Sequence, residues 1–198
     1  MKELVIATKN AGKVKEFKEM LKDFGIEVKS LLDLDFEGDI VEDGLTFEEN
    51  ATIKAETIAE WKGIPVLADD SGLEIDALDG RPGVYSARYA GEEKDDVKNM
   101  EKVLEEMQQV PDEQRTARFV CSVAVARPGH PTFVERGTCE GSIGREPRGT
   151  NGFGYDPIFY PEGADRSMAE HDPSEKNAIS HRRNAIKKVE EWLKNQNS

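Results

Sequence analysis

Short apolar runs and helix-spaced apolar residues alternate along the first part of the chain. Residues 4–7 form an apolar run of the buried-strand type, and residues 14–24 carry large apolar side chains at helical spacing as far as Gly25. A second strand is predicted over residues 26–32. The acidic stretch at residues 33–43 has little periodicity, which favours a loop or lid. The pattern therefore predicts a strand, a helix, a strand and a long loop, in that order.

The middle of the chain continues this alternation. Residues 46–49, Thr-Phe-Glu-Glu, have the pattern of a capping box, which predicts a helix that runs to about Trp61. A short strand at residues 66–68 is predicted to end at the polar stretch Asp-Asp-Ser-Gly, and another follows at residues 73–78. Residues 92–108 are predicted to form a charged amphipathic helix.

The last part of the chain shows a change of period. Residues 116–127 and 132–140 are predicted to form a long antiparallel hairpin joined at a Pro-Gly-His turn. A final helix is predicted from about residue 174 to about residue 195, with a buried stripe formed by Ile179, Ile186, Val189 and Leu193. Because helices interleave with strands while one hairpin is antiparallel, the predicted fold class is α/β, a mixed sheet flanked by helices.

Length and composition fit one globular domain over residues 1–198. Of the 198 residues, 37% are hydrophobic and 34% are charged, which is enough apolar material for a full core and excludes a disordered chain. No apolar segment approaches the roughly 18 residues that a membrane span needs. The N-terminus lacks the pattern of a signal peptide, so a cytoplasmic protein is expected. Cys121 and Cys139 have no C-x-x-C spacing and are predicted to be reduced core residues.

The net charge of −13 narrows the possible ligands. Nucleic-acid affinity depends on neutralising phosphates with lysine and arginine, so a nucleic-acid partner is not expected. An anionic ligand must instead be met by a local basic cluster or through a metal ion.

A polar turn between the first predicted strand and helix is a candidate anion site. It consists of residues 8–13, Thr-Lys-Asn-Ala-Gly-Lys, and backbone N–H groups at such a helix start can hold a phosphate. An ordinary turn capped by Asn10 remains the alternative. The segment lacks both the Walker A pattern and the three glycines of a dinucleotide fingerprint, which argues against a nicotinamide-dependent oxidoreductase.

A second candidate is the polar stretch at residues 69–72, Asp-Asp-Ser-Gly. Acids at the carboxyl end of a sheet strand lie where open α/β sheets bind ligands. Two adjacent carboxylates repel each other unless a cation or a proton lies between them, and hard oxygen ligands suit Mg2+. The alternative is that one aspartate only caps a turn. Glu42 and Asp43 are further acids that could ligate a metal.

Two later segments combine features that suit a flat, polar ligand. Residues 152–157, Gly-Phe-Gly-Tyr-Asp-Pro, interleave glycines with aromatic rings, which suits stacking; a glycine turn anchored by core aromatics is the alternative. Arg182 lies three residues after Ile179 and four before Ile186, so it is predicted to point along the buried face of the last helix. A cation in that position requires an anionic or polar partner.

Six segments together identify a family resemblance. TKNAGK, TFEENA, ADDSGL, PGVYSARYAG, GFGYDPIF and EKNAISHRR occur in this order over nearly the whole chain. The sequence resembles the bacterial branch of the inosine triphosphate pyrophosphatase family. That resemblance implies hydrolysis of nonstandard purine nucleoside triphosphates such as ITP, dITP and XTP to the monophosphate and pyrophosphate, which keeps them out of DNA and RNA. It also implies an elongated sheet in two lobes with the active-site cleft between them, Mg2+ dependence and a cytoplasmic homodimer.

The resemblance also implies a role for individual residues. Asp70 would be the catalytic carboxylate and a Mg2+ ligand, with Glu42 and Asp69 as further candidate ligands. The predicted substrate-binding residues are Thr8, Lys9, Asn10, Ala11, Gly12 and Lys13 for the triphosphate; Phe153, Gly154, Tyr155, Asp156, Lys176, His181 and Arg182 for sugar and base; and Asn50, Lys54 and Ser71 nearby. Four lysines among the candidates, Lys9, Lys13, Lys54 and Lys176, would stabilise the departing pyrophosphate.

Two related hypotheses stay open at this point. A non-catalytic nucleotide-binding regulator would need the basic turn and the base pocket but not the acid pair. A pyrophosphatase of modified pyrimidine triphosphates would share the chemistry and differ only in substrate.

Overall fold

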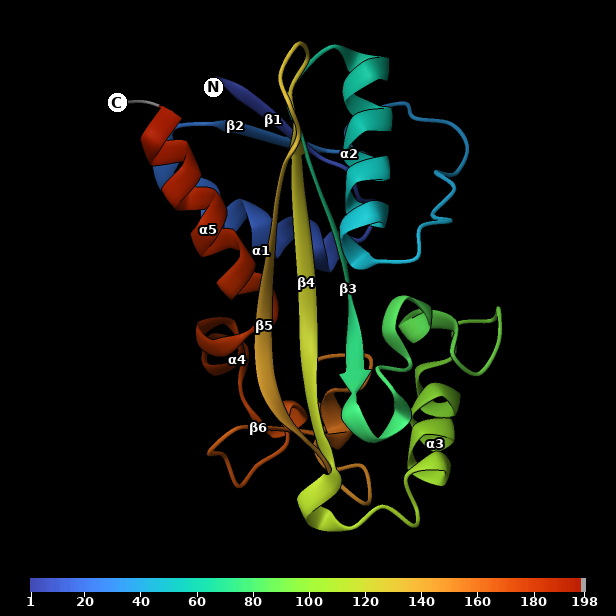
Figure 1. The fold of residues 1–198 in the computed structure, drawn as a ribbon. Coiled ribbons are helices and arrows are strands. Elements are labelled where there is room, and N and C mark those ends of the chain that lie inside the picture. Colours follow the sequence, from blue (N-terminus) through green and yellow to red (C-terminus); the bar gives the residue numbers. More distant parts are fainter. Residues whose placement is uncertain (197–198) are drawn as a thin grey trace. The chain divides into compact units, whose positions relative to one another are not determined.

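Six strands form a single mixed sheet in the order β2-β1-β3-β4-β5-β6 (Figure 1). The computed structural model describes residues 1–196. The strands are β1 (Glu3–Ile6), β2 (Glu27–Ser30), β3 (Val66–Ile75), β4 (Thr116–Ala126), β5 (Phe133–Ile143) and β6 (Phe159–Pro161); the α-helices are α1 (Ala11–Leu21), α2 (Phe47–Lys62), α3 (Asp96–Glu106), α4 (Pro173–Ile179) and α5 (His181–Gln196). β1 pairs parallel with both β2 and β3, whereas β5 and β6 are antiparallel. The predicted α/β class and mixed sheet are confirmed.

The chain forms two compact units, and neither is a continuous stretch of sequence. Unit 1 contains residues 1–70, 122–136 and 185–196, and unit 2 contains residues 71–121 and 137–184. β3, β4 and β5 therefore each contribute residues to both units. The single domain, the elongated shape and the cleft between lobes remain predictions.

Unit 1 packs helices on both faces of its part of the sheet. Val66 and Ala68 of β3 pack in one apolar cluster with Ala51 and Ala55 of α2. Because side chains alternate along a strand, Leu67 points to the other face, where α1 and α5 lie in Figure 1. Leu67 is also completely buried. Burial of both faces explains why these strands are continuous apolar runs rather than alternating ones.

The ends of α1 and α2 follow local sequence signals. Asn10 caps α1, and α1 continues as a 3₁₀ turn that ends at Gly25, whose φ of 65° requires the left-handed conformation that glycine adopts without cost. Thr46 caps α2 by accepting a hydrogen bond from the Glu49 N–H. The Glu49 carboxylate accepts from the Leu45 N–H instead of completing the predicted capping box at Thr46.

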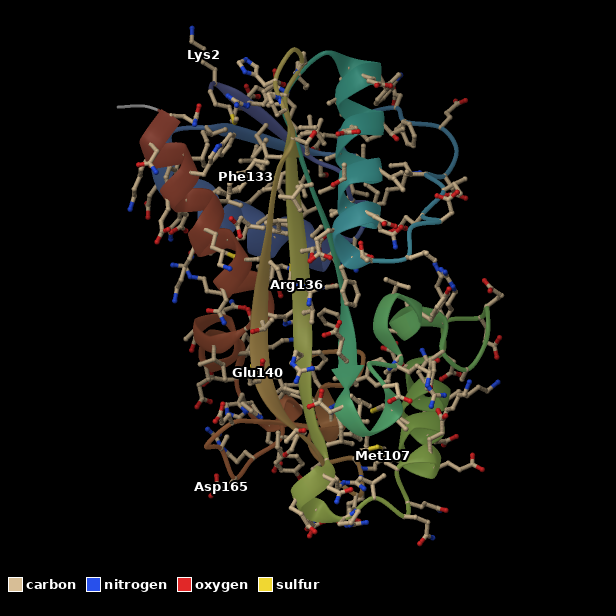
Figure 2. All side chains as sticks on the ribbon, in the orientation of Figure 1. Lys2, Met107, Phe133, Arg136, Glu140 and Asp165 are labelled. Carbon is tan, nitrogen blue, oxygen red and sulfur yellow. The ribbon has the colours of Figure 1, made fainter. Side chains whose placement is uncertain are left out.

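Side chains along β5 hold α2 and α5 against the sheet (Figure 2). Phe133 stacks on Trp192 of α5 with 4.8 Å between ring centroids. Three residues further along β5, the Arg136 guanidinium donates to Glu48 in the first turn of α2, with an Nε–Oε1 distance of 2.7 Å. The Ser122 hydroxyl of β4 donates to the same carboxylate. These contacts fix the start of α2, which carries Asn50 and Lys54.

The predicted break in the third strand is wrong. β3 runs without interruption over Val66–Ile75, so Asp69 to Gly72 lie inside a strand and not at its end. β1 ends at Ile6, which pairs with Leu67, while β4 continues as the neighbour on the other side of β3. β4 therefore keeps the acidic segment extended after β1 has ended. Beyond Ile75 the predicted strand turns into a 3₁₀ segment, Asp76–Leu78.

The single C-terminal helix predicted from about residue 174 to about residue 195 is also wrong. The helix breaks at Ser180, which is extended (φ −66°, ψ 153°), so that α4 and α5 are separate. The Ser180 hydroxyl then accepts from the Arg183 N–H, as an N-cap does. Because of this break, Ile179 is exposed instead of lying on the buried stripe, whereas Ile186, Val189 and Leu193 are buried as predicted.

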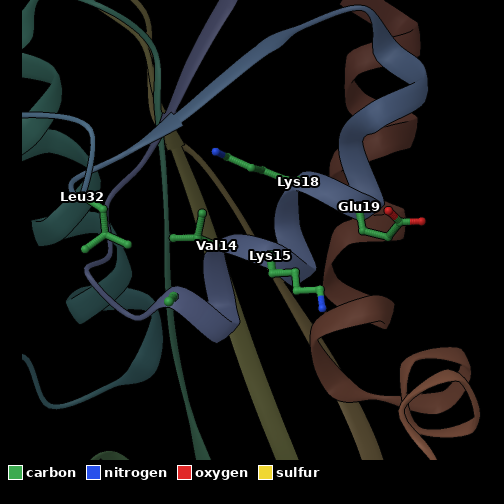
Figure 3. Close-up of a pocket in the computed structure, with 6 residues that line it drawn as sticks. Val14, Lys15, Lys18, Glu19 and Leu32 are labelled. Carbon is green, nitrogen blue, oxygen red and sulfur yellow. The ribbon is translucent and has the colours of Figure 1, made fainter.

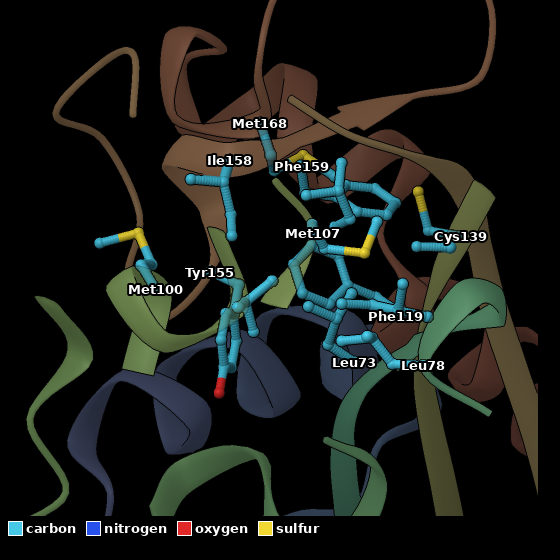
Figure 4. Close-up of a cluster of buried hydrophobic side chains, with 14 residues drawn as sticks. Leu73, Leu78, Met100, Met107, Phe119, Cys139, Tyr155, Ile158, Phe159 and Met168 are labelled. Atoms are coloured by element: carbon cyan, nitrogen blue, oxygen red, sulfur yellow. The ribbon is translucent and has the colours of Figure 1, made fainter. Parts of the chain in front are cut away.

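Unit 2 has its own apolar core (Figure 4). Leu73, Met107, Phe119 and Phe159 pack in it, and Cys139 is part of the same cluster. Cys121 and Cys139 are both buried, as predicted. The hairpin of β4 and β5 is confirmed, whereas β6 and a 3₁₀ segment over Gly83–Arg88 were not predicted.

α3 is shorter than the helix predicted over residues 92–108. It begins after its cap, Asp95, because the side chain of Asp95 accepts from the Lys98 N–H and so stops the chain from being helical earlier. Among residues 1–196, the structure contains no helix with the length and apolar character of a membrane span.

Candidate active site

Asp69 and Asp70 point to opposite faces of the sheet. Ile6 of β1 is in register with Leu67, so both aspartates lie just beyond the end of β1. Successive side chains of a strand alternate between its faces. Asp69 meets Lys13 of α1, and Asp70 meets Asn50 of α2. The two carboxylates therefore have separate partners. Their being adjacent in the sequence does not by itself place them around one cation.

Asp70 is a partly buried carboxylate held by one amide. The Asn50 Nδ2 donates to Asp70 Oδ2 at 3.2 Å, while Asn50 Oδ1 accepts from the Gly44 N–H at 2.8 Å. The second bond fixes the orientation of the amide, so its donor end faces Asp70. Burial raises the pKa of Asp70 to about 6, and repulsion from Glu42 and Asp69 adds to this, against the opposing charge of Lys54. A carboxylate with a pKa near neutrality suits general-base chemistry.

Asp69 forms a buried ion pair with Lys13. The Lys13 Nζ lies 3.2 Å from Asp69 Oδ2, and the side chain of Asp69 is only 2% exposed. This pair fixes Lys13 of the first turn of α1 against β3. Asp69 remains a predicted metal ligand, but the structure directs its carboxylate to the lysine.

The turn at residues 8–13 has the geometry of an anion site. The Thr8 hydroxyl accepts from the Asn10 N–H, and the side-chain Oδ1 of Asn10 accepts from the Lys13 N–H. The cap uses only Oδ1 of Asn10, so the amide nitrogen can donate to a ligand. Ala11 and Gly12 begin α1, where backbone N–H groups lack partners within the helix. A Cβ at Gly12 would lie 3.2 Å from Asn10 Oδ1 and crowd this cap.

Lys54 of α2 lies in an acidic environment. Its Nζ is 3.1 Å from Glu42 Oε1. Burial alone would lower the pKa of Lys54, but the charges of Asp69, Glu42 and Asp70 outweigh burial and raise it. Lys54 is therefore a fixed positive charge beside Asp70.

The loop at residues 33–43 contacts Lys9 of the predicted anion site. The Lys9 Nζ lies 5.9 Å from the centroid of the Phe36 ring.

The donor chemistry around Asp70 fits a hard divalent cation only in part. Among residues 1–196, no three His, Cys, Asp or Glu side chains are arranged as a metal-binding group. Glu42 nevertheless lies close enough to Asp70 for its charge to raise the pKa of Asp70. Two carboxylates of this kind, with water in the remaining positions, are how proteins hold Mg2+.

Unit 2 contains a second group of candidate residues around a buried carboxylate. Asp156 is 4% exposed, and its Oδ2 accepts from the Lys176 ammonium at 2.6 Å and from the Phe153 N–H at 3.1 Å. Burial raises the pKa of Asp156, although Lys176, the Phe153 N–H and Arg182 all act to lower it. The Phe153 ring itself is 53% exposed, with the Lys176 Nζ 4.5 Å from its centroid.

Tyr155 belongs to the core rather than to an accessible stacking surface. It packs among the apolar side chains of unit 2, and Figure 4 shows its hydroxyl pointing out of that cluster. The hydroxyl donates to the Ser86 carbonyl at 2.6 Å. Of the two rings proposed for stacking, only Phe153 is exposed.

His181 and Arg182 are both buried at the start of α5. Arg182 is 2% exposed, which confirms that it points inward, and its charge acts on Asp156. The His181 ring stacks on Phe119 with 5.1 Å between centroids. Ser71 follows Asp70 in β3 and is half-buried.

Comparison with known proteins identifies the family. The model of the Ham1 family matches residues 4–192. The chain belongs to the Ham1 family. A protein of Halalkalibacterium halodurans named dITP/XTP pyrophosphatase is 63% identical over 98% of this chain and 100% of its own length. A Bacillus subtilis protein of the same name is 58% identical, with 98% of each chain covered. The resemblance inferred from the motifs is confirmed.

Solved structures of Ham1 proteins have the same fold. The Staphylococcus aureus Ham1 protein matches with a TM-score of 0.91 and 45% identity, over 98% of this chain and 100% of that chain. A HAM1 protein from Coxiella burnetii matches with a TM-score of 0.92, also at 45% identity and over the same shares of the two chains.

Gly152 of this Ham1 chain leaves room for the Asp156 carboxylate. Its φ is 72°, and an added Cβ would overlap the Asp156 carboxylate. We expect Gly152→Ala to raise the KM for the substrate about 10-fold, because the methyl group displaces the carboxylate that holds Phe153 and Lys176. Steady-state kinetics and a melting curve measure the effect.

Gly163→Ala is the matched control for Gly152→Ala. Gly163 has a similar φ of 79°, but an added Cβ there meets nothing within 4 Å. It has the same backbone strain, so its melting temperature should fall while KM stays unchanged. Equal KM values in the two variants would contradict the role assigned to Gly152.

An open hollow beside α1 includes only one of these candidate residues. Its volume is about 430 Å3, and it is lined by Ala11, Val14, Lys15, Lys18, Glu19 and Leu32 (Figure 3). Ala11 is the only candidate substrate-binding residue among them, and neither Lys9 nor Lys13 contributes. We assign no ligand to this hollow.

Two glycines shape the candidate site, and sequence reasoning missed one of them, Gly44. Gly44 orients Asn50, and a Cβ at Gly44 would lie 2.7 Å from Asn50 Oδ1. Gly152 leaves room for Asp156. Gly44 lies just before the TFEENA motif, and a glycine beside a polar cluster was the available signal for close backbone approach. Gly152 is the first residue of the GFGYDPIF motif, but its role in accommodating Asp156 was not predicted.

Proposed function

We propose that this chain hydrolyses nonstandard purine nucleoside triphosphates, namely ITP, dITP and XTP, to the monophosphate and pyrophosphate. The observation that carries the proposal is the arrangement around Asp70: a carboxylate with a raised pKa, positioned by Asn50 and flanked by Lys54. Relatives named dITP/XTP pyrophosphatase at 58–63% identity support the choice of substrate.

In the proposed mechanism, the turn at residues 8–13 binds the outer phosphates. The first N–H groups of α1 donate to phosphate oxygens, and Lys9 and Lys13 add positive charge. Lys13 is held in place by Asp69, so little of its side-chain entropy remains to be lost on binding. These groups stabilise the charge that develops on the departing pyrophosphate.

Asp70 is proposed to act as the general base. Its carboxylate accepts a proton from the water that attacks the α-phosphorus, while Asn50 holds the acceptor oxygen in position. Lys54 stabilises the negative charge on the phosphate oxygens. Asp70 and Glu42 would hold Mg2+, which when bound supplies further charge neutralisation at those oxygens.

The residues of unit 2 are proposed to bind base and sugar. Phe153 provides an exposed ring for stacking, and Arg182 provides donors for the 6-carbonyl of hypoxanthine or xanthine. Lys176 pairs with Asp156, so we place it with this group and not with the lysines around the pyrophosphate. The expected homodimer and cytoplasmic location remain predictions.

The products of ITP hydrolysis test where the bond breaks. Attack at the α-phosphorus yields IMP and pyrophosphate, whereas attack at the γ-phosphorus yields IDP and orthophosphate. We expect pyrophosphate, because the lysines of the turn hold the outer phosphates and Asp70 faces the inner one. Anion-exchange chromatography of a reaction with Mg2+ separates the products, and orthophosphate as the first product would contradict the proposal.

A panel of nucleoside triphosphates tests the substrate class. We expect kcat/KM to be highest for ITP, dITP and XTP among purine and modified pyrimidine triphosphates. Binding of these nucleotides without turnover would favour a regulator instead, and a preference for a modified pyrimidine would favour the related class of pyrophosphatase.

A further inference from the structure

The backbone that carries Phe153 is held by two carboxylates from different elements. The Phe153 N–H donates to Asp156 at 3.1 Å, within the same loop. The next N–H along the chain, that of Gly154, donates to Asp96 Oδ2 at 3.0 Å. Asp96 is the first residue of α3, and 58 positions separate it from Gly154. Two consecutive peptide groups are thus each held by a carboxylate, one from the same loop and one from α3.

These two hydrogen bonds matter because the glycines of this loop have a large conformational entropy to lose on ordering. Gly152 and Gly154 flank Phe153 with φ values of 72° and 61°, and glycine has more conformational freedom to lose than any other residue. The Phe153 ring is exposed, so the packing of its own side chain contributes little to ordering. Besides the Lys176 ammonium over the ring, hydrogen bonds to the backbone are therefore the contacts that hold Phe153 in place.

The start of α3 is a rigid support for such a contact. Asp95 caps the helix by accepting from the Lys98 N–H at 3.1 Å. Asn99, which is 2% exposed, accepts from the Ala90 N–H at 2.7 Å and donates to the Ala87 carbonyl at 2.9 Å. The first turn of α3 is thus fixed to the segment Ser-Ala-Arg-Tyr-Ala that precedes it.

That segment is tied in turn to both β3 and the loop. The Ser86 hydroxyl accepts from the Leu73 N–H of β3 at 2.9 Å, and the Ser86 carbonyl accepts from the Tyr155 hydroxyl at 2.6 Å. The loop is therefore connected to α3 directly through Asp96 and indirectly through Tyr155. This network gives the PGVYSARYAG motif a structural role that its sequence did not reveal.

We propose that Asp96 is a positioning residue for purine binding, acting through the Gly154 N–H to hold Phe153 in its stacking position. The inference rests on the proposed function, because it assigns a purine base to the Phe153 ring. Asp96 makes no contact with the reacting groups in this role. Its contribution is to reduce the ordering that the loop must undergo when substrate binds.

The test is a kinetic comparison of Asp96→Ala with the intact protein, using ITP and Mg2+. Loss of one exposed, charge-assisted hydrogen bond should raise KM about 3-fold to 10-fold and leave kcat nearly unchanged, because base stacking is the same in the ground and transition states. Asp96→Asn keeps a carbonyl oxygen that can accept from Gly154 and should restore most of the affinity. Asp96 is exposed, so both variants are expected to fold.

Asp95→Ala is the matched control. It removes the cap of α3 and should lower the melting temperature, but it leaves the contact between Asp96 and Gly154 in place. A role limited to stabilising α3 would therefore make Asp95→Ala the more harmful variant. The positioning role predicts the reverse for KM: unchanged in Asp95→Ala and raised in Asp96→Ala.

Each result supports or overturns one specific claim. A normal KM in Asp96→Ala, or an equal rise in Asp95→Ala, overturns the inference while the proposed function stands. A raised KM in Asp96→Ala that Asp96→Asn restores supports it. If the unsubstituted protein hydrolyses no purine nucleoside triphosphate, the proposed function fails first, and the role of Asp96 in purine binding fails with it.

Discussion

Replacing Asp70 by asparagine is expected to lower kcat for ITP by about 10²-fold or more, because the amide cannot accept a proton from water at neutral pH. The same substitution keeps the size of the side chain and an oxygen for Asn50 to donate to. The loss should therefore appear in kcat at saturating Mg2+ and substrate, measured as pyrophosphate release. Near-normal turnover would show that another carboxylate acts as the base.

The same variant should be more stable than the unsubstituted protein when no metal is present. The pKa of Asp70 is about 6 in the folded state, against an ordinary value of 3.8, so the folded state favours the protonated form. The stability linked to this group is fully present below about pH 4 and is lost as the pH rises through 6. Because Asp70 is partly exposed, the loss is about 1–2 kcal/mol.

Melting curves in EDTA measure this linkage. Asp70→Asn should melt about 2–6 °C above the unsubstituted protein at pH 7.5, and the difference should disappear at pH 4. Asp69→Asn is the control, since Asp69 is paired with Lys13 and almost completely buried. Breaking that pair should lower the melting temperature. A general effect of charge would change the melting temperature in the same direction for the two neighbouring aspartates. Changes in the same direction would therefore contradict the raised pKa assigned to Asp70.

Replacing Arg182 by alanine is expected to reduce the preference for ITP over ATP by about 10-fold to 100-fold. Hypoxanthine presents a carbonyl acceptor at position 6, whereas adenine presents an amino donor there. Arginine has only donors, and an unpaired buried donor costs about 1–3 kcal/mol. Loss of Arg182 removes the mismatch with adenine along with the bond to hypoxanthine. The ratio of kcat/KM for the two nucleotides measures the effect.

Two further variants make the test of Arg182 specific. Arg182 is almost completely buried and acts on Asp156, so alanine leaves both a void and a less compensated carboxylate. Arg182→Lys keeps the charge and should fold better, but it cannot present the paired donors of a guanidinium, so the ratio should still fall. Arg183→Ala removes a charge from the same helical turn and should leave the ratio unchanged. An unchanged ratio in both Arg182 variants would transfer base recognition to the backbone of the loop at residues 153–156.

Local signals in the sequence determined the types of most elements and several of their ends. The Asn10 and Thr46 caps and the turn at Gly25 depend only on a few neighbouring residues, and each occurs where the pattern predicts. The inward direction of Arg182 also followed from its spacing to Ile186, because both residues lie in α5 and helix periodicity holds over one turn. The spacing to Ile179 did not contribute, because Ile179 belongs to α4 and is exposed. The family followed from the order of six motifs, which no single element could establish.

Tertiary structure decided the features that depend on a neighbour far away in the chain. Asp69 to Gly72 look like a turn locally, yet they remain extended because β4 continues beside β3 after β1 has ended. The helix predicted from about residue 174 breaks at Ser180, which exposes Ile179 and places His181 and Arg182 at a helix start. Alternation along β3 gives the two aspartates different partners on α1 and α2. Asp96 carries no local signal of its contact with Gly154, because hydrogen bonds between distant segments depend on packing, which local propensity does not encode.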